Sequence, residues 1–100
     1  MQQIEVSVVY LSFFQELTGT REERVKVQKG MTLREFLELL CVRHGEVFRK
    51  TIFDPKTGRV FSHNHITLNG QLAHLLDKNL GVNLREGDRV VIAHAVSGGE

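Results

Sequence analysis

The sequence predicts an α+β fold, in which a mixed β-sheet packs one main helix across one face. Three observations predict it: two alternating segments open the chain, a capped amphipathic helix begins at Thr32, and a short apolar segment precedes a glycine pair. The expected order is β-β-α-β-β with irregular late connections. We expect residues 1–100 to form one domain, with residues 96–100 as a flexible tail.

The first two strands are predicted by alternating polarity over residues 4–11 and 23–27, with a helical turn over residues 13–17 between them. Segment 4–11 is rich in β-branched residues, which favour strands. The residues that share one face of it are Ile4, Val6, Val8 and Tyr10.

The main helix is predicted over residues 32–44. Thr32 and Glu35 have the spacing of a capping box, and Gly45 is a natural stop. The apolar side chains recur at helical spacing and should face the sheet; they are Leu33, Phe36, Leu37, Leu40 and Cys41.

The second half of the chain alternates short strands with turns. Residues 54–58 and 84–88 are predicted turns, a strand at 66–68 enters an Asn-Gly turn, and the last strand covers residues 89–95. The first and last strands are the most apolar, so we expect them at the centre of the sheet.

Composition limits the function classes. Hydrophobic residues make up 41% of the chain and the net charge is +1, so we expect neither a nucleic-acid partner nor a membrane partner. One cysteine excludes an internal disulfide and suits a reducing compartment. With no predicted signal peptide or membrane span, we expect a cytoplasmic protein.

No group of residues predicts catalysis by this chain. His63 and His65 could lie on one face of a strand, but zinc takes three or four ligands, so we expect loop histidines and no metal site. Cys41 lies on the buried face of the helix and is expected to be core, because a reactive thiol is usually exposed beside positive charge. No glycine-rich phosphate loop is present.

The last residues, Val96-Ser97-Gly98-Gly99-Glu100, are the most informative segment. Glycines add nothing to a core, but they let a main chain enter a narrow channel and present an unhindered carboxylate. The alternative is a frayed terminus.

An apolar patch is predicted beside this tail. Val9 and Leu11 alternate out of step with the core residues of the first strand, as Val91 and Ala93 do in the last. If the two strands are parallel neighbours, these residues form either a docking surface or a face covered by another layer.

Together these features resemble the ubiquitin-like β-grasp sulfur carriers, most closely the small subunit of molybdopterin synthase. The resemblance covers nearly the whole chain. The segments that carry it are residues 14–19, the capped helix from Thr32, residues 66–70, residues 84–90, and Val96-Ser97-Gly98-Gly99.

The resemblance implies a carrier and not an enzyme. An E1-like adenylyltransferase would use ATP to adenylate the Gly99 carboxyl, and sulfur would displace AMP to leave a thiocarboxylate. The tail, including Gly98, would then enter the large subunit of molybdopterin synthase or another sulfur acceptor. No cofactor is expected to bind stably. The residues implied in docking are Val9, Leu11, Leu72, Val91 and Ala93.

Three departures from this family leave the pathway open. His94-Ala95 stand where many members have Pro-Pro, residues 53–65 exceed what compact members need, and Glu100 follows the glycine pair. Some relatives carry extra residues that a zinc peptidase removes. The alternatives are a carrier for tRNA thiolation, cysteine, thiamin or a siderophore, a modifier joined to lysine through Gly99, and an interaction domain that is never activated.

Overall fold

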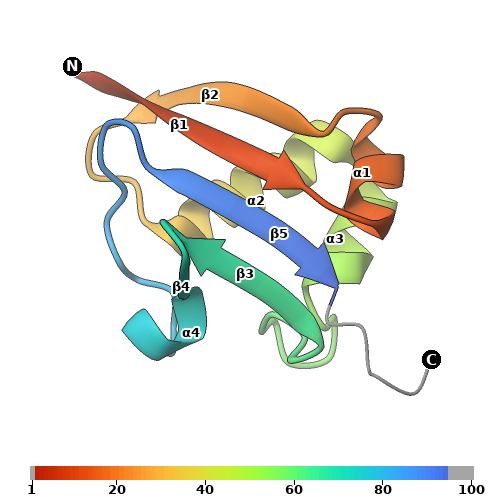
Figure 1. Ribbon diagram of the computed structural model, residues 1–100. Helices are drawn as coiled ribbons and strands as arrows, with labels where there is room; N and C mark the ends of the chain where they lie inside the picture. Colours follow the sequence, from red (N-terminus) through yellow and green to blue (C-terminus); the bar gives the residue numbers. More distant parts are fainter. Residues whose placement is uncertain (1, 95–100) are drawn as a thin grey trace.

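The computed structural model describes residues 2–94 and confirms the α+β class (Figure 1). Five strands form one mixed sheet in the order β2-β1-β5-β3-β4, and α2 crosses behind it. The bounds are β1 (Gln3–Tyr10), α1 (Phe13–Thr18), β2 (Glu22–Gln28), α2 (Leu33–His44), α3 (Glu46–Ile52), β3 (Asn64–Leu68), β4 (Gln71–Leu72), α4 (Ala73–Leu76) and β5 (Arg89–His94).

The first and last strands are parallel neighbours inside the sheet, as predicted. β1 pairs with β5 on one side and antiparallel with β2 on the other, while β3 runs antiparallel to β5. The inward residues of the two central strands are completely buried because helices cover this face; they include Val6, Val8, Tyr10, Val90 and Ile92.

The predicted capping box opens α2. The Glu35 amide donates to Thr32 Oγ1 at 3.2 Å, and the Thr32 amide donates to Glu35 Oε1 at 2.9 Å. These bonds satisfy amides that the first helical turn leaves without partners. The five predicted core residues of this helix are all buried, with exposures between 0% and 2%.

Two helices were not expected from the sequence. The predicted helical turn is α1, whereas α3 and α4 correspond to no helix predicted from the sequence. Phe48 and Ile52 of α3 stand four residues apart and enter the core. Asn64, at the start of β3, connects the two ends of the loop between α3 and β3. Its Nδ2 donates to the Thr51 and Ile52 carbonyls at 2.9 and 3.3 Å.

A tight turn joins β3 to β4. Asn69 and Gly70 have φ of 52° and 88°, the left-handed pair that a two-residue hairpin turn needs. The Asn-Gly turn is therefore confirmed. β4 has only two residues before the chain turns into α4, so it covers only one end of β3.

Within residues 2–94, no helix combines the length and the apolar character needed to cross a bilayer.

Candidate functional site

The candidate site lies where β5 ends, at His94. The residues predicted to carry the chemistry, Val96, Ser97, Gly98 and Gly99, lie outside the described residues, as do Ala95 and Glu100. The structure therefore describes the surface from which this segment departs.

The strand register brings most of the predicted docking residues together on the open face of the sheet. Val9 lies opposite Val91, Val91 opposite Thr67, and Thr67 opposite Leu72, so these four form one row across four strands. Ala93 lies two residues beyond Val91 on the same face of β5, opposite His65. Leu11 follows β1, and its amide donates to the Ile92 carbonyl at 3.0 Å.

Val9 departs from the expected exposed patch. It is only 3% exposed, whereas Leu11, Leu72, Val91 and Ala93 are half-buried. Glu22 is its partner on β2, and the Glu22 carboxylate reaches across β1 to Arg89 Nη1 at 3.3 Å. The stems of such long side chains cover apolar surface, which leaves Val9 little area for a partner.

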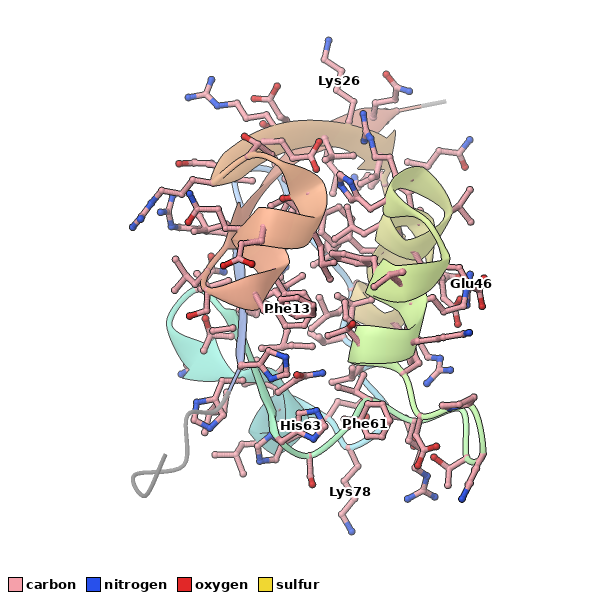
Figure 2. The ribbon with its side chains drawn as sticks, turned by 90° about the vertical axis from the view of Figure 1, so that its right-hand side faces the viewer. Phe13, Lys26, Glu46, Phe61, His63 and Lys78 are labelled. Atoms are coloured by element: carbon pink, nitrogen blue, oxygen red, sulfur yellow. The ribbon has the colours of Figure 1, made fainter. Side chains whose placement is uncertain are left out.

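A series of stacked rings holds the end of β5 in place. The His94 ring stacks on Phe14 at 5.3 Å between centroids and on His63 at 5.3 Å, with interplanar angles of 26° and 8°. His63 stacks in turn on Phe61 at 4.9 Å, and Figure 2 shows these two side by side. Offset ring pairs at such distances contribute about 0.5–1.5 kcal/mol each.

Sequence reasoning missed this ring cluster. Its members come from α1, the segment before β3 and the end of β5, and only the fold brings them together. The one signal was His94, which stands where many members of the resembled family have proline. Phe13 is 42% exposed, and its ring lies 6.0 Å from the His94 ring at the end of β5.

The other chemical candidates are His63, His65 and Cys41. His63 and His65 lie before and within β3, and residues 2–94 hold no group of three or more potential metal ligands. Cys41 is 2% exposed, and burial raises the pKa of its thiol to about 11. It stays a protonated core thiol at neutral pH, as predicted.

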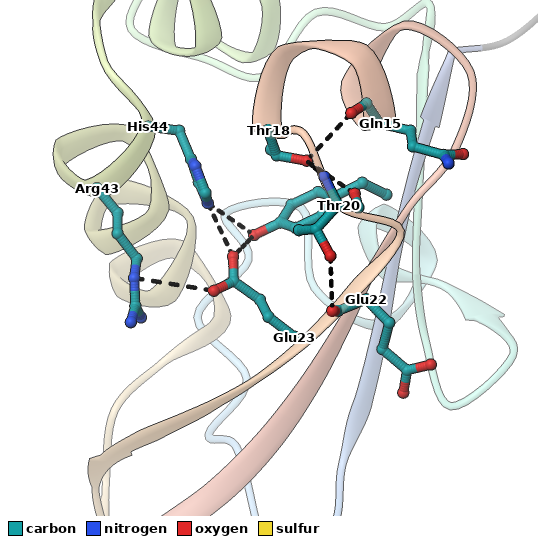
Figure 3. A network of polar contacts seen from close by, with 8 residues as sticks. Gln15, Thr18, Thr20, Glu22, Glu23, Arg43 and His44 are labelled. Atoms are coloured by element: carbon teal, nitrogen blue, oxygen red, sulfur yellow. Dashed lines mark hydrogen bonds and ion pairs between the residues drawn. The ribbon is translucent and has the colours of Figure 1, made fainter.

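One polar cluster joins β1, β2 and α2 (Figure 3). Glu23 Oε2 accepts from the Tyr10 hydroxyl at 2.5 Å and lies 2.8 Å from His44 Nε2, while Glu23 Oε1 lies 3.8 Å from Arg43 Nε. Tyr10 is wholly buried and His44 packs on Phe48, so the cluster connects elements and presents no open substrate site.

Comparison with known proteins identifies the fold and the family. The model of the ThiS family matches residues 8–99, and no curated protein matches the chain. SAMP1 from Haloferax volcanii is 25% identical, with a TM-score of 0.78 over 95% of this chain and 99% of its own.

Two further solved structures share the fold. A putative molybdopterin converting factor subunit 1 from Pyrococcus furiosus is 24% identical, with a TM-score of 0.72 over 93% of this chain and 99% of its own. CysO from Mycobacterium tuberculosis is 20% identical, with a TM-score of 0.72 over 91% of this chain and 99% of its own. The sheet, the helix across it and the family match agree, and the chain belongs to the ThiS family of ubiquitin-like β-grasp sulfur carriers.

Proposed function

We propose that this chain is a sulfur carrier that reacts through Gly99 and is not itself a catalyst. An E1-like adenylyltransferase joins the Gly99 carboxylate to AMP and releases pyrophosphate from ATP. A sulfur donor then displaces AMP and leaves a thiocarboxylate. The observation that carries the proposal is the family match, which extends through Gly99 and so includes the glycine pair.

The geometry of the described residues supports a carrier. The ring cluster fixes His94, and the half-buried apolar residues Val91 and Ala93 lie on the same strand for a partner to contact. The five residues from Ala95 to Gly99 span at most about 18 Å when extended. We therefore propose that the partner binds at the end of β5 and that its active site lies within this distance.

The proposed pathway is synthesis of the molybdenum or tungsten cofactor, with the large subunit of molybdopterin synthase as the sulfur acceptor. The similarity to the putative molybdopterin converting factor subunit 1 supports this choice.

Glu100 makes the given chain a precursor in this proposal. The family match ends at Gly99, one residue before Glu100. We propose that a peptidase, of the zinc class that trims some relatives, removes Glu100 before activation.

A protein modifier is the second candidate. The H. volcanii relative at 25% identity is a small archaeal modifier protein, which favours an isopeptide bond between Gly99 and a lysine.

Intact-mass analysis of the protein from its native cells tests the proposal. A sulfur carrier gives a species that ends at Gly99 and is about 16 Da heavier than the carboxylate form, because sulfur replaces oxygen. The matched control is Gly99→Leu, which should show no such gain. Adducts to lysine would favour the modifier, and a chain found only with an unmodified terminus would contradict both.

A further inference from the structure

A cavity of about 480 Å³ lies between helix α4 and the loop that joins α3 to β3. Small-molecule sites commonly have volumes of about 300–1,000 Å³. Ile66 lines the cavity and pairs with Ile92, whose side chain is wholly buried, so the cavity is on the helix-covered side of the sheet. Leu75 of α4 also lines it and is 74% exposed. The other residues that give it apolar surface are Val60, Ala73 and Leu80.

One wall of this cavity holds a hydrogen-bond acceptor without a partner. Asn64 lines the cavity and is only 6% exposed. Its Nδ2 donates to the Thr51 and Ile52 carbonyls, whereas its Oδ1 has no hydrogen-bond partner within the described residues. Buried polar groups are rarely left unpaired, and an unpaired one destabilises the fold until a donor reaches it. The wall therefore favours a ligand that carries an N–H or O–H group.

The charged residues around this cavity are basic. Arg34, Arg59, Lys78 and His74 line it, and no aspartate or glutamate is among the described residues that do so. Arg34 lies 3.5 Å from Glu38, whereas Arg59 and Lys78 form no ion pair with residues 2–94. A cavity lined by one sign of charge attracts ligands of the other sign. The ligand that fits this lining is therefore an anion.

We propose that this cavity binds a small organic anion that has an apolar body and a hydrogen-bond donor. The apolar body lies against Ile66 and Ala73. The anionic group pairs with Arg59 and Lys78, and the donor bonds to Asn64 Oδ1. A few polar groups that fix the orientation of a ligand over an apolar surface are typical of small-molecule sites. The site is separate from the open face of the sheet and from the proposed reaction at the C-terminal glycine.

Indole-3-acetate is the probe that tests the site, because it has a carboxylate, an apolar ring system and an N–H donor. It is titrated into the ¹⁵N-labelled full chain and followed by NMR. We expect saturable shifts of the Ile66, Ala73 and Leu75 amides and of the Asn64 side-chain amide. The Kd should be about 1 mM or lower.

Two control probes each change one feature of indole-3-acetate. The first is 1-methylindole-3-acetate, which lacks the donor and so tests Asn64 without changing a residue that connects the loop to α3. It should bind at least about threefold more weakly. The second is tryptamine, which carries an ammonium group in place of the carboxylate. It should bind at least about tenfold more weakly, because the lining is basic.

Variants of the chain test the charges. Arg59→Glu and Lys78→Glu should each weaken the binding of indole-3-acetate by about threefold to tenfold, because each replaces an attraction by a repulsion. Both side chains are exposed, so the fold should tolerate either change. Lys26→Glu is the matched control, because Lys26 is also exposed but lies on β2, at the opposite end of the molecule from Lys78 (Figure 2).

Three results with these probes would overturn the proposal. They are no shift of the cavity amides at millimolar indole-3-acetate, equal binding of either control probe, and shifts confined to Val91 and Ala93 on the open face.

Two further measurements separate a small anion from other occupants. A capped tripeptide with tryptophan between two aspartates that binds at least about tenfold more tightly than indole-3-acetate would assign the cavity to a segment of a partner protein. Shifts of the Ile66 and Ala73 amides that depend on protein concentration, without any probe, would assign it to a second copy of the chain. Either result would contradict the proposal.

Discussion

The Tyr10 hydroxyl donates a hydrogen bond to Glu23 Oε2 at 2.5 Å, which joins the buried end of β1 to the neighbouring strand. Burial is the main cause that raises the pKa of Tyr10 above its ordinary value of 10.0, and the hydrogen bond to Glu23 raises it further. Burial alone would also raise the pKa of Glu23. The hydrogen bonds from Tyr10 and His44 and the charges of His44 and Arg43 outweigh it, so the pKa of Glu23 lies below its ordinary value of 4.5.

This shift predicts acid sensitivity. A carboxyl that is more acidic in the folded state stabilises that state above its unfolded pKa, and the contribution is lost as pH falls through the folded pKa. The free energy of unfolding should therefore decrease as pH is lowered below about 4.5, and Glu23→Gln should reduce that decrease.

Urea unfolding between pH 7 and pH 3 measures this effect. The control is Glu16→Gln, because Glu16 is exposed on α1 and forms no ion pair with residues 2–94. If Glu23→Gln and Glu16→Gln change the free energy of unfolding with pH in the same way, the cluster does not control acid stability.

Leu37 should be essential to the core under α2. It is wholly buried in the hydrophobic cluster, so Leu37→Ala should lower the free energy of unfolding by about 2–5 kcal/mol through lost burial and a cavity. Val42 is 77% exposed on the same helix, so Val42→Ala should change the free energy of unfolding by less than about 0.5 kcal/mol. Equal losses in the two variants would contradict the packing described.

The sequence predicted the elements whose signals are local. The capping box at Thr32, the helical spacing through Leu40 and the Asn69-Gly70 turn each depend on residues close in the chain, and the structure has all three. α3 was missed because it has only seven residues, although Phe48 and Ile52 stand at helical spacing.

The candidate site was predictable only in part. Alternation placed Val91 and Ala93 on the open face, where the register confirms them. Val9 is buried beside Glu22, whose ion pair with Arg89 spans three strands, and no pattern within one strand carries that information. The stack around His94 likewise joins three distant segments.

The open face should bind the activating enzyme. Ala93 is half-buried there beside Val91, and Ala93→Asp would leave an unpaired charge inside the proposed interface. We expect the affinity for the activating enzyme to fall by at least about tenfold in a calorimetric titration. Val47→Asp, at a position on α3 that is 59% exposed, is the control and should bind like the parent chain.

Circular dichroism should show that both aspartate variants remain folded. Unchanged affinity of a folded Ala93→Asp variant would remove this face from the proposed interaction.

The central claim is that Gly99 reacts once Glu100 is gone. In the given sequence the Gly99 carboxyl is joined to Glu100 by a peptide bond, so it has no free carboxylate to adenylate. A variant that ends at Gly99 supplies that carboxylate. Trimmed Gly99→Leu is the control, because its side chain should prevent entry into the activating site.

ATP–pyrophosphate exchange with a matching E1-like enzyme tests this claim most directly, with intact mass confirming each terminus. We predict exchange with the chain that ends at Gly99, and none with the full-length chain or with trimmed Gly99→Leu. Equal exchange by a full-length chain that still carries Glu100 would contradict the precursor claim. No exchange by the trimmed chain would contradict activation at Gly99.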